Sequence, residues 1–167
     1  VVGDRNAIKT VYGLDHTPED IKRSLIDLHE EGIKTIIPHI CIGFDYGQIK
    51  GEMNAIDMLS VITPAALVFI VLIPTRGSEM EHCEPPNIDE VIRVIEYARS
   101  IYKRIPIYLG CMRPRSGEHR EYNRALELRA IDAGISGIVL PSKSSLEYLQ
   151  QHDIKIKSYS TCCAVVK

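Results

Sequence analysis

The chain has 167 residues, of which 45% are hydrophobic and 25% charged, a composition typical of a soluble globular protein with a sizeable core. Its formal net charge of −2 gives no electrostatic reason to expect a nucleic acid or an anionic membrane as a partner. The longest apolar run, residues 65–73, is far shorter than the roughly 20 residues of a membrane-spanning helix. We therefore expect a single domain, 1–167, without a membrane anchor.

Two further features concern the cellular setting and the start of the chain. The five cysteines are odd in number and show no C-x-x-C spacing, which argues against a disulfide framework and for a reducing compartment, the cytoplasm. The first residues, VVGD (1–4), look like the end of a strand. The chain is therefore expected to continue a fold whose beginning is missing.

Helix-like and strand-like segments then alternate along the chain. Thr17 is a suitable N-cap, Pro18 suits the first helical position, and apolar residues follow with helical spacing up to Gly32. By the same criteria the sequence predicts helices at 17–32, 51–62, 87–102, 121–134 and 144–153. Apolar or alternating segments predict strands at 33–43, 67–74, 105–111, 137–141 and, as an edge strand, 154–160. This alternation indicates βαβ units in a parallel sheet, that is, the α/β class.

The loops that follow the predicted strands differ from the turns that precede them. They are long and rich in glycine, proline and charge, and residues 5–16 are read as one of them, whereas the turns from helix to strand are short. This asymmetry is typical of a TIM-type barrel, whose functional site lies at the carboxyl ends of the strands. Cys41, Pro74, Cys111 and Pro141 are therefore expected at one common end.

Several stretches, in order, resemble the radical S-adenosylmethionine (radical SAM) superfamily, and biotin synthase in particular. The run PTRGSEM (74–80) resembles the P-x-x-G-T-P stretch of biotin synthase. The run IGFDYGQIKGE (42–52) resembles the glycine-rich fifth-strand region, where backbone and apolar groups border the adenine. Four more stretches look like archaeal-type homologues of biotin synthase, a group that includes two-component lipoyl synthases: YGLDHTPEDI (12–21), LGCMRPR (109–115), AIDAGISGIVLPS (130–142) and CCA (162–164).

The resemblance implies a TIM-type barrel that binds S-adenosylmethionine and a 4Fe–4S cluster. Such an enzyme abstracts hydrogen from, and inserts sulfur into, a carboxylate-bearing substrate that is either a small molecule or bound to a carrier protein. The C-x-x-x-C-x-x-C loop that defines the superfamily is absent from this chain. We therefore interpret the chain as the carboxyl half of the barrel, with the cluster supplied by a missing amino-terminal half or by a partner subunit. Alone, it is not expected to cleave SAM.

The resemblance also suggests which residues border the cofactor. Gly43, Gly47 and Gly51 lack side chains, so that backbone there is able to approach an adenine closely; the alternative is a turn followed by the start of a helix. Asp4 is a candidate acceptor for ribose hydroxyls, or else a cap of the next segment. Pro74 and Thr75, in the biotin synthase-like run, complete the predicted cofactor-binding set.

Three residues are candidates for substrate binding. Arg113 and Arg115 follow a predicted strand, where a guanidinium is able to bind a carboxylate through two parallel hydrogen bonds. By the resemblance, Arg113 also matches an arginine that biotin synthase offers to an auxiliary cluster, and the alternative for both is a surface pair bridging to Glu118 or Glu121. His39 lies near the end of a predicted strand and is either a core histidine or a contact to substrate or cofactor.

The cysteines leave open an auxiliary iron–sulfur cluster, since thiolates are its usual ligands. Cys111, Cys162 and Cys163 are the candidate ligands, with buried or surface thiols as the alternative. Cys41 is most simply a small buried hydrophobe, and Cys83 beside His82 has no recognised metal spacing.

Two other functions remain open from the sequence. One is a non-catalytic half-barrel that completes its sheet with a partner, because half a barrel exposes free strand edges. The other is an ordinary TIM-barrel enzyme that binds a phosphate ester at PSKSS (141–145) and GCMRPR (110–115).

Overall fold

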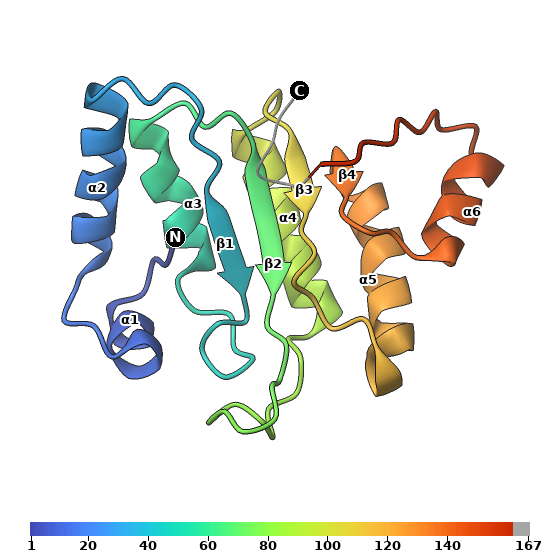
Figure 1. The fold of residues 1–167 in the computed structure, drawn as a ribbon, viewed down its shortest axis with the longest axis horizontal. Helices are drawn as coiled ribbons and strands as arrows, with labels where there is room; N and C mark the ends of the chain where they lie inside the picture. Colours follow the sequence, from blue (N-terminus) through green and yellow to red (C-terminus); the bar gives the residue numbers. More distant parts are fainter. Residues whose placement is uncertain (162–167) are drawn as a thin grey trace.

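The computed structural model describes residues 1–161, and its elements are shown in Figure 1. The helices are α1 (Arg5–Tyr12), α2 (Pro18–Glu30), α3 (Glu52–Met58), α4 (Ile88–Ile101), α5 (Arg120–Asp132) and α6 (Lys143–Gln151). The strands are β1 (His39–Ile42), β2 (Leu67–Val71), β3 (Ile107–Leu109) and β4 (Gly137–Ile138). The 3-10 turn η1 (Leu59–Val61) follows α3, and the 3-10 turn η2 (Gly117–His119) precedes α5.

The strands form one four-stranded sheet in the order β1-β2-β3-β4, in which every neighbouring pair is parallel. Each pair of neighbours is joined by a crossover that contains a helix: α3 after β1, α4 after β2 and α5 after β3. Parallel strands require such crossovers. The predicted α/β class and parallel sheet are confirmed, and the carboxyl ends of the strands lie at one end of the sheet.

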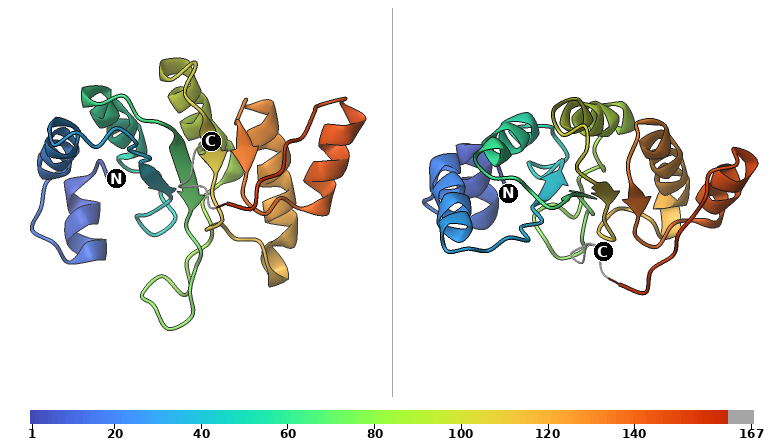
Figure 2. Two further views of the ribbon diagram at one scale, coloured as in Figure 1. Left: turned by 45° about the horizontal axis from the view of Figure 1, so that its top comes forward. Right: turned by 90° about the horizontal axis from the view of Figure 1, so that it is seen from above.

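The layers of the fold are those of half a barrel. Seen from above, helices α2 to α6 form an outer arc and the strands lie along its inner side (Figure 2). An open doubly wound sheet carries helices on both faces, whereas a (β/α) barrel carries them only outside. One face of this sheet is therefore covered by helices, and the other is the concave face that a barrel would enclose.

The core lies between the sheet and the arc of helices. Alternate strand residues point into it, as the two-residue period of a strand requires. These are Ile40, Ile42, Leu67, Phe69, Val71, Ile107 and Leu109, and they pack against helical residues such as Leu59, Val91, Ile95 and Leu126.

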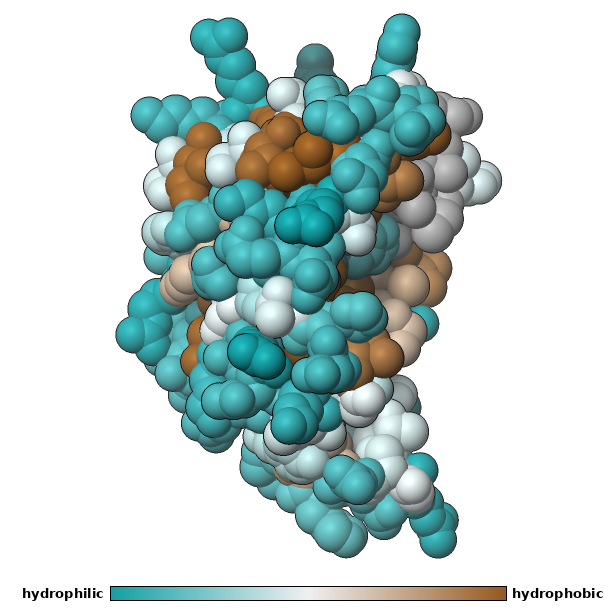
Figure 3. Space-filling view, turned by 90° about the vertical axis from the view of Figure 1, so that its left-hand side faces the viewer, coloured by the Kyte–Doolittle hydropathy of each residue, from teal (hydrophilic) through white to brown (hydrophobic). Residues whose placement is uncertain are grey.

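Helix α2 closes one side of the molecule, and its local sequence explains where it begins. Thr17 and Asp20 form a reciprocal capping box, with Pro18 at the first helical position. The surface on this side is mostly hydrophilic, with apolar atoms gathered toward one end (Figure 3). Leu28 and Ile33 are among the exposed apolar residues of this part of the chain, at 46% and 47%.

Strand β1 begins later than the sequence predicts, and Pro38 explains why. Proline has no N–H to donate to a strand ladder, so the segment 33–38 is not a strand even though the carbonyls of Ile36 and Pro38 accept from Ala65 and Val68, at 2.9 and 3.0 Å.

Two predictions at the amino-terminal end of the chain are wrong. Residues 1–4 form no strand; Val1 lies beside β1, where its nitrogen donates to the carbonyl of His39 at 2.6 Å. The segment 5–12, read as loop, is helix α1, which Asp4 caps and Gly13 ends in a left-handed conformation. Only Ala7 and Ile8 of α1 are buried, so the helix has too short an apolar stripe to stand out in the sequence.

The predicted edge strand at 154–160 is also wrong. This segment is exposed. At its start, the N–H of Ile154 donates to the carbonyl of Leu149, in α6, at 2.9 Å. Its alternating pattern has no neighbouring strand to pair with, because β4 is only two residues long. Within residues 1–161, no helix has the length and apolar character needed to cross a bilayer.

Candidate functional site

The candidate site is the carboxyl end of the sheet, as the sequence predicts. Four loops meet the strands there: 43–51 after β1, 72–87 after β2, 110–119 after β3 and 139–142 after β4. The first two loops pack against each other: Gly43 lies against the Pro86 ring, and Gly47 lies against the backbone of Glu84.

The three glycines of the β1–α3 loop have a structural reason to be glycine. Gly43, Gly47 and Gly51 all have positive φ angles, of 76°, 83° and 89°, a region that side chains disfavour. A Cβ atom at Gly43 would lie 2.7 Å from Cγ of Pro86, and one at Gly47 would lie 2.6 Å from the carbonyl oxygen of Glu84. Tight turns and contacts within the chain therefore account for these glycines, and their approach to an adenine remains a prediction.

Asp4 lies beside this loop, because a Cβ at Gly51 would come within 2.6 Å of the Asp4 nitrogen. The Asp4 side chain caps α1, where Oδ1 accepts the N–H of Ala7 at 2.8 Å. The capping alternative is thus the one observed. The fold also places Asp4 next to Gly51, and cofactor binding by either residue remains a prediction.

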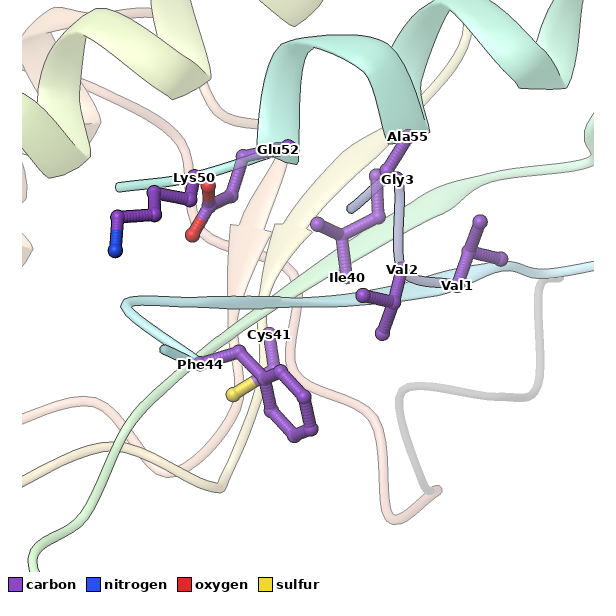
Figure 4. A pocket seen from close by; sticks show the side chains of 10 residues that line it. Val1, Val2, Gly3, Ile40, Cys41, Phe44, Lys50, Glu52 and Ala55 are labelled. Atoms are coloured by element: carbon purple, nitrogen blue, oxygen red, sulfur yellow. The ribbon is translucent and has the colours of Figure 1, made fainter. Parts of the chain in front are cut away.

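A small pocket lies between the β1–α3 loop and residues 1–3 (Figure 4), and Glu52, the first residue of α3, points into it. Its cavity of about 10 Å³ has room for about one water molecule. The Glu52 side chain is almost fully buried, with 3% of its residue surface exposed. Oε1 accepts the N–H of Gly43 at 2.9 Å, whereas Oε2 has no hydrogen-bond partner. The sequence did not single out Glu52, because an acidic residue in the first turn of a helix is usually exposed.

The electrostatics of this pocket favour neutral groups. Burial raises the pKa of the Glu52 carboxyl, and the backbone N–H groups of Gly43, Glu52 and Lys50 oppose that rise only in part. Burial, assisted by the nearby Glu52 carboxylate, raises the pKa of the Cys41 thiol to about 11. Cys41 is therefore a protonated thiol at neutral pH, but it is partly exposed and not the buried hydrophobe that the sequence suggests.

The concave face of the sheet carries His39, Cys41, Ile70 and Tyr108, all of them partly exposed. These residues alternate with the core residues of their strands, and the register continues across the sheet from His39 through Val68 to Tyr108. Nδ1 of His39 lies 3.0 Å from the carbonyl oxygen of Ile37. His39 is thus partly exposed on the concave face and not in the core, but it is the first residue of β1 and does not lie near the carboxyl end of the strand, where the sequence predicts it. A contact to substrate or cofactor remains a prediction.

Arg113 is not where the sequence prediction put it. The predicted binding of a substrate carboxylate needs an accessible guanidinium, but Arg113 is 1% exposed and packs between the strand ends and α5. All five N–H donors of its guanidinium are used within the chain. The acceptors are Gly110 O (2.6 Å), Val139 O (2.9 Å), Leu140 O (3.1 Å), Asn123 Oδ1 (2.8 Å) and Glu127 Oε1. No donor of Arg113 is left for a substrate carboxylate.

Glu127 extends this buried network to the start of α6. Its Oε2 accepts the N–H of Ser142 at 2.8 Å and the hydroxyl of Ser145 at 2.5 Å. A carboxylate of the protein itself therefore occupies the amino end of α6, where an anion would otherwise bind. This contact argues against the phosphate-ester alternative at PSKSS.

The remaining predicted residues lie at the mouth of the candidate site. Arg115 is exposed and forms no ion pair with Glu118 or Glu121 among the contacts of residues 1–161. The Thr75 hydroxyl donates to the carbonyl of Ile73 at 2.9 Å. Binding roles for Arg115, Thr75 and Pro74 remain predictions.

A polar cleft of about 450 Å³ separates the β2–α4 and β3–α5 loops. It is lined by Pro74, Glu81, His82, Cys83, Glu84, Glu118 and His119. No three His, Cys, Asp or Glu side chains in the described part of the chain are placed to hold a metal ion. Cys111 is partly exposed and belongs to no such group. Cys162 and Cys163 lie outside the described residues.

Comparison with known proteins gives one distant similarity. The biotin synthase of Ruthia magnifica subsp. Calyptogena magnifica is 27% identical over 93 residues, which are 53% of this chain and 29% of that protein. No protein-family model matches the chain. The aligned part thus spans less than a third of the relative's length, and the chain is distantly and partially similar to biotin synthase.

Proposed function

We propose that this chain is the carboxyl half of the barrel of a radical SAM enzyme related to biotin synthase. The observation that carries the proposal is the half-barrel itself: a four-stranded parallel sheet with helices outside and a concave face inside. The distant similarity to biotin synthase supports it, as does the order of the resembling stretches.

In this proposal the other four strands of an eight-stranded barrel come from an amino-terminal half or from a partner subunit. That half would pair with the free edge of β4 and cover the concave face. It would also bring the 4Fe–4S cluster, because residues 1–161 offer no suitable ligand group. When bound, the cluster would supply the electron that cleaves SAM, and this chain would supply enclosure and orientation.

The residues of this chain then divide into two roles. His39, Tyr108 and Cys41 on the concave face would border the reacting groups and exclude water from them. At the mouth, Arg115 would bind the carboxylate of a small or carrier-bound substrate, since Arg113 has no donor to spare. Arg113 instead holds the ends of β3 and β4 at the site.

The test uses the intact gene product, or the chain with its partner subunit, purified anaerobically. Iron and sulfide analysis and the release of 5′-deoxyadenosine from SAM would support the proposal. The Arg115→Ala variant should keep the iron content and the uncoupled SAM cleavage but raise KM for the carboxylate substrate. An intact protein that binds neither iron nor SAM would overturn the radical function, leaving a half-barrel that serves only to associate with a partner.

A further inference from the structure

A buried carboxyl group fastens the β1–α3 loop at both of its ends. Gly43 directly follows β1, and Glu52 begins α3. The hydrogen bond from the Gly43 N–H to Glu52 Oε1, 2.9 Å long and buried, joins them across nine positions of the chain. Because Glu52 is 3% exposed and its Oε2 is unpartnered, this contact lies in a place where water does not stabilise a charge.

The other polar side-chain contacts of the loop lie in solvent, whereas Phe44 and Ile49 pack against buried apolar residues. Lys50 Nζ pairs with Asp45 Oδ2 at 2.6 Å, and the Tyr46 hydroxyl donates to Glu79 Oε2 at 3.0 Å, both in exposed positions. Exposed pairs contribute about 0–1 kcal/mol each. The contact between Gly43 and Glu52 is therefore a buried polar contact that joins the two ends of the loop.

The charged side chains around Glu52 do not compensate a negative charge on it; the backbone N–H groups of Gly43, Lys50 and Glu52 itself favour the carboxylate, but less than burial disfavours it. The Asp45 carboxylate in the loop repels a carboxylate at Glu52. The Cys41 thiol on β1 is neutral and does not balance its charge. Lys50 extends away from Glu52 (Figure 4) and pairs with Asp45. An ionised Glu52 is thus costly in the closed loop and gains by moving into water.

We propose that Glu52 is a proton-dependent latch of the β1–α3 loop. With its carboxyl group protonated, it holds Gly43 against the start of α3. When the proton is lost to solvent, the carboxylate leaves the pocket and the hydrogen bond between Gly43 and Glu52 is broken. The segment 43–51 then becomes more mobile. The latch acts at the ligand-binding end of the sheet, so it would make loop order there depend on pH; the inference itself does not depend on the proposed function.

Amide hydrogen exchange of Gly43 in this chain alone, without SAM or iron, tests the latch. Its protection factor should fall up to tenfold per pH unit above the ordinary Glu pKa of 4.5, and then level off above the raised pKa of Glu52. The isosteric variant Glu52→Gln keeps an acceptor for Gly43 but does not titrate. Its protection factor should not vary with pH over the same range.

Glu81→Gln is the matched control. Glu81 also accepts the N–H of a loop glycine, Gly77, at 2.5 Å, but in an exposed position, so this variant should retain the pH dependence of the wild type at Gly43. Equal slopes in the wild type and in Glu52→Gln would overturn the latch. Should Glu52→Gln not fold, the carbon-13 titration of the Glu52 carboxyl in the wild type decides: a midpoint above 4.5 supports the latch, and one at or below 4.5 overturns it.

Discussion

Arg113 and Glu127 form an ion pair in which both side chains are fully removed from solvent. The pair joins the loop after β3 to the middle of α5, and through the remaining hydrogen bonds of both residues it also holds the ends of β3 and β4 and the start of α6. The geometry of the carboxyl end of the sheet on this side is therefore set by one buried network.

Removing Arg113 should destabilise the fold, not merely an activity. Arg113→Ala leaves Glu127 as a buried charge without its partner, a change that typically costs about 3–5 kcal/mol. Urea unfolding followed by circular dichroism measures the difference. Arg115→Ala, two residues away but exposed, is the control and should change the free energy of unfolding by less than about 0.5 kcal/mol. Equal effects of the two substitutions would contradict the structural role of Arg113.

Glu127 should make the fold sensitive to acid. Burial by itself would raise its pKa, but hydrogen bonds from Ser145, Ser142 and Arg113 outweigh burial and lower it below the ordinary value of 4.5. A lowered pKa gives stability that is present above pH 4.5 and is lost as the pH falls through the folded-state value. In Glu127→Gln the decline of unfolding free energy below pH 4.5 should be shallower by up to about 1.4 kcal/mol per pH unit. An unchanged acid limb would show that Glu127 is not ionised in the fold.

Gly51 should tolerate a side chain less well than a glycine of similar backbone conformation. Both Gly51 and Gly13 have positive φ, but a Cβ at Gly13 meets nothing within 4 Å, whereas one at Gly51 meets the Asp4 nitrogen at 2.6 Å. Gly13→Ala should cost about 1–2 kcal/mol for the left-handed conformation alone. Gly51→Ala should cost about 1–3 kcal/mol more through overlap. Thermal unfolding compares them, and equal losses would leave Gly51 free of that packing constraint.

Cys41 should be slow to alkylate at neutral pH although it is partly exposed. With a pKa of about 11, about one thiol in a thousand is a thiolate at pH 8, and only the thiolate reacts. Peptide mapping after iodoacetamide treatment should give a rate that rises about tenfold per pH unit until pH 11. Complete modification at pH 7 would contradict the protonated thiol.

The architecture was accessible from the sequence because its signals are local. Thr17 with Asp20, and Asn87 before α4, satisfy backbone N–H groups of their own helices, and apolar runs such as 67–71 mark a central strand, buried at four of its five positions. The same locality explains the errors at the ends: α1 buries only two residues, and the alternation of 154–160 records a preference for pairing that no neighbour satisfies.

The candidate site was less predictable, because its residues are defined by partners distant in the chain. An arginine after a strand looks the same in sequence whether it faces a ligand or turns inward; Arg113 turns inward because Glu127, fourteen positions later, lies on the buried face of α5. Glu52 likewise became notable only when α3 placed it over the end of β1, where Gly43 is its hydrogen-bond donor.

The order of the strands has a consequence for how the chain folds. Every strand pairs with the strand that precedes or follows it in the chain, so each pairing closes a loop of only one helix and its turns. Shorter loops lose less entropy on closure than longer ones, so each of these pairings costs less than a pairing between strands distant in the chain. We therefore expect that β1 and β2 with α3 are able to pair first and that β3 and then β4 add in turn. The sheet grows by repeating one step, and each step leaves the earlier pairings unchanged.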